Sequence, residues 1–227
     1  MRIKFLVHSL IILVPVLILG AGCKKGKTDA APKDIDGNIY HTVTIGSQVW
    51  MVENLKVTHY RNGDPLSNVL NDTAWVNLIT GAYCDYNNNS NYTTTYGELY
   101  NWYAIHDPRN IAPAGWHIPS DAEWTTLLNS WGGASAAGGK LKEAGTTHWY
   151  SPNGGATNES GFTGLPAGDR HSLNGGFENV TKSALWWSAT EYDNGQAWYY
   201  ALNNMNGAAY RSQFSKKIGF SVRCVKD

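Results

Sequence analysis

The residues best suited to hold a ligand lie in and beside a glycine-rich stretch between residues 132 and 180. Four offer charge or hydrogen-bonding groups and two offer flat indole faces: Trp149, Asn158, Glu159, Asp169, Arg170 and Trp187. Aromatic faces flanked by amides and acids suit sugar rings. Because a long loop region in a compact domain is usually functional or held by specific contacts, these six are the predicted ligand-binding residues. The alternative is that Asn158 and Glu159 only pin their own loop through internal hydrogen bonds.

Residue types that serve catalysis and metal binding show no recognisable spacing. The acids and the seven histidines are scattered, and neither G-x-S-x-G nor H-E-x-x-H occurs. His106 falls on an apolar helical pattern, which predicts a packed residue and not a ligand. We therefore expect no catalytic residues, no enzyme activity and no cofactor. Metal binding is left open, because structural calcium held by carbonyl and amide oxygens leaves little trace in a sequence.

Cys23 lies in a setting that predicts a covalent modification. A basic start, an apolar run over residues 5–19 and small residues at 20–22 precede it. This pattern is typical of a secretory signal peptide, and the run is shorter than the ~20 residues of a membrane span. Residues 19–23 resemble the lipobox of bacterial lipoproteins, whose cysteine is acylated, although Gly20 stands where that pattern prefers leucine. The alternative is an ordinary cleaved signal followed by a chance cysteine.

The segment after Cys23 is predicted to be an unfolded tether. Residues 24–33 are small, polar and rich in lysine, without an apolar period. The expected organisation is a signal peptide over residues 1–22, a lipidated tether over residues 23–33 and one domain over residues 34–227. Several acyl chains on one residue anchor a protein stably. We expect an exported protein held at the outer membrane by its lipid, and the basic tether favours the periplasmic face.

Charge and composition limit which kinds of partner and which classes of fold are expected. The chain has 18 basic and 18 acidic residues. The signal peptide holds Arg2, Lys4 and no acid, so 16 basic and 18 acidic residues remain, a net charge of −2. Without a basic stripe beyond the tether, nucleic acid is not an expected partner. All ten tryptophans and most of the 24 glycines lie after the tether. They indicate short strands, tight turns and aromatic packing, not a helical bundle.

Two helices and several strands are predicted. Residues 98–106 carry apolar side chains on one helical face, and Ser120 with Glu123 forms a capping box before a second helix that ends at residues 132–133. The remaining patterns predict a hairpin over residues 39–45 and 48–55, and an antiparallel meander over residues 184–190, 197–202, 208–214 and 219–225. Between them, residues 132–180 are expected to form loops, with only a short helical turn at residues 140–144.

Two cysteines remain beyond the tether, Cys84 and Cys224. An exported protein meets oxidising conditions, so an even remainder of two predicts one disulfide. The alternative is a pair of buried thiols.

The chain carries short motifs in a fixed order. They lie at residues 36–40, 45–55, 83–88, 96–102 (YGELYNW), 115–124 (GWHIPSDAEW), 156–162, 186–190 and 219–225 (GFSVRCV). Together they resemble the Fibrobacter succinogenes major paralogous domain, which is common in lipoproteins of Bacteroidetes. The resemblance spans about residues 34–227. That family has no agreed activity, so the resemblance names no substrate.

A weaker resemblance concerns the fold. The helix start at residues 119–124 and the terminal Gly219-Phe220 pair are similar to C-type-lectin-like and formylglycine-generating-enzyme-like domains. This resemblance implies an α+β domain with a curled antiparallel sheet, two helices, a long loop region and terminal strands that lie together. The copper-binding cysteine pair of the generating enzyme and the calcium–sugar motifs of the lectins have no counterpart here.

These observations favour a non-enzymatic binding module at the cell envelope, for a glycan or a protein partner. The alternative is a structural or assembly subunit of an envelope complex. Exposure of the aromatic side chains separates these hypotheses most cheaply, because a binding module must present some of them to solvent.

Lipidation makes a direct prediction. Replacing the acylated residue (Cys23→Ser) should leave the protein soluble or unprocessed, because the tether and domain contain no other predicted membrane anchor. Fractionation of cells into membrane and soluble pools measures this. If the variant still fractionates with membranes, the anchor assignment is wrong.

Overall fold

The domain is organised by a three-stranded antiparallel sheet in the order β11-β10-β9. Its strands are β9 (Ser183–Glu191), β10 (Gln196–Asn203) and β11 (Ala209–Ser215). The computed structural model describes residue 1 and residues 30–227, and the folded unit spans Ala31–Asp227. The signal peptide and Cys23 lie outside the described residues. Within the described part, no helix is long and apolar enough to cross a membrane.

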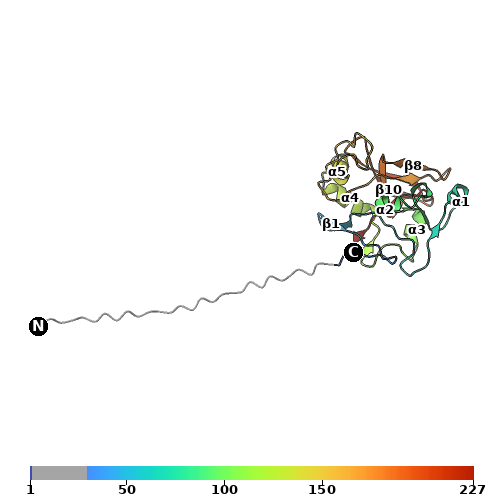
Figure 1. Cartoon of the computed structure of the whole chain (residues 1–227), viewed down its shortest axis with the longest axis horizontal. Helices are drawn as coiled ribbons and strands as arrows, with labels where there is room; N and C mark the ends of the chain where they lie inside the picture. Colours follow the sequence, from blue (N-terminus) through green and yellow to red (C-terminus); the bar gives the residue numbers. More distant parts are fainter. Residues whose placement is uncertain (2–29) are drawn as a thin grey trace. The chain divides into compact units, whose positions relative to one another are not determined.

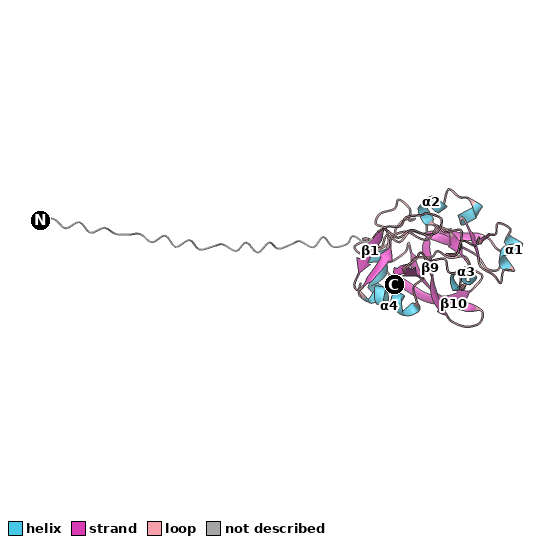
Figure 2. Ribbon diagram, turned by 90° about the horizontal axis from the view of Figure 1, so that it is seen from below, coloured by secondary structure: helices cyan, strands magenta, loops and turns pink. Residues whose placement is uncertain are grey.

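Side chains along β9 alternate between two separate cores. Successive residues of a strand point to opposite faces of the sheet. Ala184 and Trp186 therefore join one hydrophobic cluster, and Leu185 and Trp187 join another. Both tryptophans are fully buried. The strands lie in the middle of the domain with helices at its margin (Figure 2).

The Trp186 face is covered by two helices that lie on one side of the domain (Figure 1). The first is α4 (Asp121–Asn129), where the predicted capping box is confirmed: Ser120 accepts from the Glu123 amide, and Glu123 accepts from the Ser120 amide. The indole of Trp124 stacks on the ring of Tyr200 from β10, with ring centroids 5.1 Å apart. The second is α5, which the sequence did not predict.

Close backbone contact explains why α5 (Ala134–Leu141) was missed. Gly138 and Gly139 lower the local helix propensity, so only a turn near residues 140–144 was expected. A Cβ atom on Gly138 would lie 2.3 Å from the Ala208 carbonyl oxygen, and one on Gly139 would lie 2.1 Å from that of Gly155. The glycines are therefore required by tertiary packing, which overrides helix propensity at this site.

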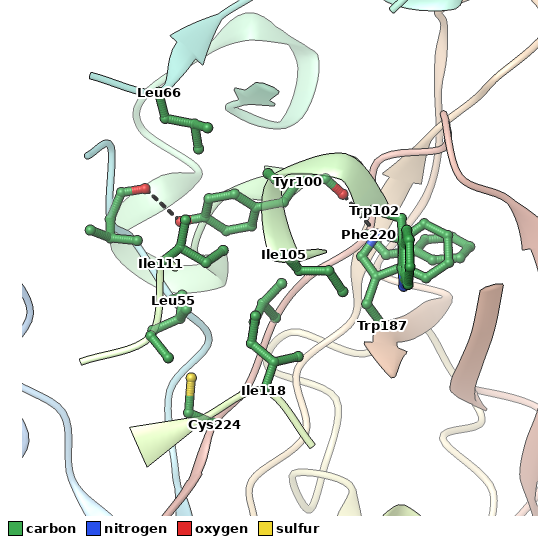
Figure 3. Packing of buried hydrophobic residues seen from close by; sticks show 14 of the residues in the cluster. Leu55, Leu66, Tyr100, Trp102, Ile105, Ile111, Ile118, Trp187, Phe220 and Cys224 are labelled. Carbon is green, nitrogen blue, oxygen red and sulfur yellow. Dashed lines mark hydrogen bonds between the residues drawn. The ribbon is translucent and has the colours of Figure 1, made fainter. Parts of the chain in front are cut away.

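On the other face, Trp187 shares a hydrophobic cluster with Trp102 and Ile105 of α3 (Trp102–His106) and with Tyr100 and Phe220 (Figure 3). The indole N–H of Trp187 donates to the Tyr100 carbonyl oxygen at 2.8 Å. The Tyr100 hydroxyl donates to the Val57 carbonyl oxygen, also at 2.8 Å. These bonds satisfy polar groups inside an apolar cluster, which is the usual condition for burying Trp and Tyr.

The helix expected over residues 98–106 is shorter than predicted. Leu99–Tyr100 forms strand β5, and the helix begins at Trp102 because the Asn101 side chain accepts from the amide of Ala104. His106 is exposed, and its ring stacks on Trp102 with centroids 4.4 Å apart. It therefore packs on a neighbouring ring, as expected, although it does so from the surface.

A four-stranded sheet in the order β1-β2-β12-β6 joins the two ends of the domain. The predicted hairpin is confirmed as β1 (Thr42–Ile45) and β2 (Gln48–Met51). The last predicted strand is wrong in extent and place. Only Val225–Lys226 forms β12, and it pairs with β2 and with β6 (Trp116–His117) instead of extending the meander. The terminal strands do lie together.

The remaining elements are short. They are β3 (Ser67–Asn68), α1 (Asp72–Val76), β4 (Ala82–Cys84), the 3₁₀ turn η1 (Tyr86–Asn88), α2 (Thr93–Tyr96), β7 (Ala167–Arg170) and β8 (Phe177–Val180). The described residues thus contain five α-helices instead of the two expected. The class is α+β with mostly antiparallel strands, as predicted. The region expected to be loops contains α5 and the β7–β8 hairpin.

The predicted disulfide is wrong. Cys84 and Cys224 are free and buried. Each thiol packs in a different apolar cluster: Cys84 with Trp75 and Leu99, and Cys224 in the cluster of Trp187 (Figure 3). Burial raises the pKa of Cys84 to about 12 and also raises the pKa of Cys224. The alternative of two buried thiols therefore holds.

A buried polar cluster ties distant segments together. The Asn54 side-chain oxygen accepts from the Trp186 indole at 2.8 Å and from Nη2 of Arg223 at 3.0 Å. The Asn54 amide donates to the Tyr96 carbonyl oxygen at 2.8 Å. The Arg223 guanidinium lies 4.1 Å from the ring centroid of Phe162. Burial lowers the pKa of Arg223 to about 9, so this cation depends on its hydrogen bonds and ring contacts.

This cluster predicts a large loss of stability in an Asn54→Ala variant. The change removes the acceptor of the Trp186 indole and one of the two acceptors of the Arg223 guanidinium, the other being the Phe162 carbonyl oxygen, which should cost on the order of 3 kcal/mol in the free energy of unfolding. Urea unfolding measures it. Asn62→Ala is the control, because Asn62 is exposed and its side chain bonds only to nearby Asp64. Equal losses in the two variants would contradict the proposed role of Asn54.

Candidate ligand-binding pocket

Both tryptophans predicted to face a ligand are instead core residues. Trp149 is 1% exposed and Trp187 is 0% exposed. The Trp149 indole donates to the Gly164 carbonyl oxygen at 3.0 Å, and that of Trp187 to Tyr100. The prediction that they offer a free apolar face is therefore wrong. Each indole instead fills one of the two hydrophobic clusters on opposite faces of the sheet.

Arg170 is also a structural residue. Its side chain is fully buried, and its guanidinium lies 4.5 Å from the ring centroid of Trp75. It donates to the carbonyl oxygens of Gly175 and Leu70 at 2.9 Å and to the Asp72 carboxylate at 2.8 Å. All these partners belong to the domain itself. Arg170 therefore ties β7 to the α1 region and is not a ligand contact.

Asn158 pins its own loop, as the alternative interpretation expected. Its side-chain oxygen accepts from the Thr163 amide at 2.9 Å, and its amide donates to the Thr163 hydroxyl at 3.0 Å. Asn158 has a φ of 54°, in the left-handed region that asparagine tolerates better than most residues. Glu159 is exposed on the same turn. Neither residue lines the pocket described next.

Asp169 is the predicted residue that does line a pocket. The pocket has a volume of about 200 Å³ and lies where the β7–β8 hairpin meets the Trp187 face of the sheet. Its walls come from β7, β8, β9, β10, β11 and the segment that follows β11. They are formed by Asp169, His171, Glu178, Asn179, Leu185, Tyr199, Phe214, Ile218 and Phe220.

The acidic wall is set by the register of the hairpin. Asp169 pairs directly with Glu178 across β7 and β8, so both side chains lie on one face. The Asn179 amide donates to an Asp169 carboxylate oxygen at 2.7 Å. Gly168 permits this close pairing, because a Cβ atom there would lie 2.3 Å from the Glu178 carbonyl oxygen. The hairpin therefore presents two carboxylates and one amide to the pocket.

The environment of Asp169 raises its pKa from 3.8 to about 6. Burial is the main cause, since Asp169 is only 3% exposed. The nearby charge of Glu178 adds to the increase, while the hydrogen bond from Asn179 and the proximity of His171 oppose it. A carboxylate in this position lacks full compensation for its lost hydration.

A second group of lining residues is aromatic. The rings of Tyr199 and Phe220 lie with centroids 4.8 Å apart, and Phe214 lies 6.4 Å from Tyr199. Trp187 supports this group from the core, with its ring centroid 4.8 Å from that of Phe220. Tyr199 and Phe214 are half-buried, so parts of their rings are accessible from the pocket. The pocket therefore combines hydrogen-bond acceptors with ring surfaces.

The pocket brings together acceptor groups and aromatic rings. Within residues 30–227, no three His, Cys, Asp or Glu side chains gather as metal ligands. Two carboxylates, an amide and three aromatic rings can accept hydrogen bonds from a polar ligand while they cover one apolar face.

Most lining residues were missed by sequence reasoning. The missed signal is the run over residues 167–180, where Asn174-Gly175-Gly176 separates two short segments, a pattern typical of a hairpin. Tyr199 and Phe214 lie on predicted strands. Which face of the sheet their side chains occupy depends on the register of β10 with β11, which pairs Tyr199 with Ser212.

The family model of the Fibrobacter succinogenes major domain matches residues 43–226. This match covers most of the chain, so the chain belongs to that family. No curated protein matches the chain, and no solved structure does.

The raised pKa of Asp169 predicts a pH-dependent cost to stability. The folded state holds this proton more tightly than the unfolded state, so the favourable contribution is complete below pH 3.8 and is lost as the pH rises through about 6. An Asp169→Asn variant removes this titration. Relative to the variant, the wild type should lose on the order of 2 kcal/mol of unfolding free energy across this window. Urea unfolding at several pH values measures the difference, and a constant difference would contradict the assignment.

Proposed function

We propose that this member of the Fibrobacter succinogenes major domain family is a lipid-anchored, non-enzymatic envelope protein whose Asp169 pocket binds a glycan. The observation that carries the proposal is the pairing of acceptors with ring faces in one hollow. Sugar rings present hydroxyl donors at their edge and apolar C–H groups on their faces. Carboxylate and amide oxygens of Asp169, Glu178 and Asn179 match the edge, and the Tyr199 and Phe214 rings match a face.

The size of the pocket favours one sugar unit of a longer chain. A volume of about 200 Å³ is below the ~300–1,000 Å³ of pockets that enclose drug-sized ligands. The pocket is therefore suited to a terminal or side-branch ring, with the rest of the glycan lying outside. Binding of this kind is weak for each site, and many anchored copies would strengthen it by multivalency.

The predicted anchor supports an envelope location. Acylation at Cys23 would hold the domain at the outer membrane through the lysine-rich tether, within reach of cell-envelope or extracellular glycans. A C-type-lectin-like course of the chain is part of the proposal. It is supported by the pairing of β12 with β2 and by the antiparallel β9–β11 sheet.

A glycan array tests the proposal. The mature chain carrying Cys23→Ser should bind a defined set of glycans, and Tyr199→Ala should weaken that binding by roughly tenfold, equivalent to ~1.4 kcal/mol. Tyr210→Ala is the matched control, because Tyr210 is exposed on β11 and does not line the pocket. It should bind as tightly as the parent.

Two outcomes would count against the proposal. Absence of binding to every glycan would favour the alternative of an envelope assembly subunit. Equal losses in the Tyr199 and Tyr210 variants would move the glycan site away from the pocket.

A further inference from the structure

The walls of the pocket hold more acidic than basic side chains. Asp169 and Glu178 are both acidic, and the lining residues include no lysine or arginine. His171 is the only lining residue that can become a cation. Its Nδ1 atom accepts a hydrogen bond from the Leu173 amide at 3.3 Å, so this nitrogen is engaged within its own turn.

Three cations close to the pocket in sequence are bound elsewhere. Arg170 follows Asp169 but is held by Asp72 and backbone carbonyls. Lys216 forms an ion pair with Glu191, and the Lys217 ammonium donates to the Val76 carbonyl oxygen at 2.9 Å. None of these three basic side chains lines the pocket. A cationic group on a ligand would therefore balance the two carboxylates better than these basic side chains do.

The chemistry of the walls specifies the missing group. An ammonium group donates charge-assisted hydrogen bonds to carboxylates, which are roughly twice as strong as neutral ones. It is also attracted to aromatic faces, such as those of Tyr199 and Phe214. We infer that the pocket takes an amino sugar, with its protonated amine between the Asp169 and Glu178 carboxylates and its ring against the aromatic wall. This inference rests on the proposed glycan function.

A neutral sugar should be accepted less well for a physical reason. Its hydroxyl groups can donate to the carboxylates, but they leave two like charges uncompensated in a partly desolvated site. The amine removes this cost and gains a charged hydrogen bond. The discrimination therefore depends on one substituent of the ring.

Isothermal titration calorimetry with glucosamine, glucose and N-acetylglucosamine tests the inference, because these sugars share a ring and differ at one substituent. With the mature Cys23→Ser chain at neutral pH, glucosamine should bind at least roughly tenfold more tightly than either neutral sugar. Binding should weaken as salt is added, because the interaction is between charges.

Variants locate the preference. Asp169→Asn and Glu178→Gln should each reduce the preference for glucosamine to about twofold or less, because each removes one carboxylate. Glu178 is exposed, so its substitution tests the inference even if the Asp169 variant is unstable. Glu159→Gln removes an exposed acid outside the pocket and should keep the preference.

The outcomes separate this inference from the proposed function. Equal affinity for the three sugars would overturn the inference and leave glycan binding intact. If the chain binds none of them but binds lysine amide, the inserted group is a peptide cation and the amino-sugar inference is wrong. If neither sugars nor lysine amide bind, the amino-sugar inference is also wrong, and in both cases the glycan array decides the proposed function separately.

Discussion

Two consecutive tryptophans on β9 impose the constraint on which the rest of the domain depends. Because neighbouring side chains of a strand face opposite ways, Trp186 and Trp187 must be buried on opposite faces of the β9–β11 sheet. Each indole also needs an acceptor inside an apolar cluster. Asn54 supplies one and the Tyr100 carbonyl oxygen supplies the other. The sheet must therefore be covered on both sides by segments distant in sequence.

The pocket is a consequence of how one of these faces is covered. Trp187 packs against the ring of Phe220, and Tyr199 also packs against that ring. The β7–β8 hairpin crosses the same face and brings Asp169 with it. Arg170 anchors the hairpin, because its guanidinium forms an ion pair with Asp72 of α1. A rigid aromatic support and an anchored hairpin together give the carboxylates a defined position, which a selective binding site requires.

Local sequence signals predicted the elements whose cause is local. The Ser120–Glu123 capping box and the β1–β2 hairpin are set by a few neighbouring residues, and both were found. The helix α5 was not predicted because its glycines are required by close contact with the distant backbone at Ala208 and Gly155. Burial of Trp149 likewise depends on a distant acceptor, Gly164. Sequence patterns report such long-range contacts poorly.

The candidate site shows the same limit. Asp169 was identified from its residue type, but its partners depend on pairing across the β7–β8 hairpin and on the facing of β10. The prediction of a disulfide was wrong for a related reason. Counting cysteines assumes that they can meet, whereas each thiol is enclosed by its own cluster. Residue type alone identifies candidate site residues, and the topology of the strands decides which of them come together.

Chemical-shift mapping tests the central claim most directly, namely that the Asp169 pocket is the glycan site. The mature Cys23→Ser chain, labelled with ¹⁵N, would be titrated with the sugar that binds best. The account predicts amide shifts concentrated at residues 169–171 and 177–180, with further shifts near Tyr199 and Phe214. Shifts centred on residues 149–159, or spread without a centre, would contradict it.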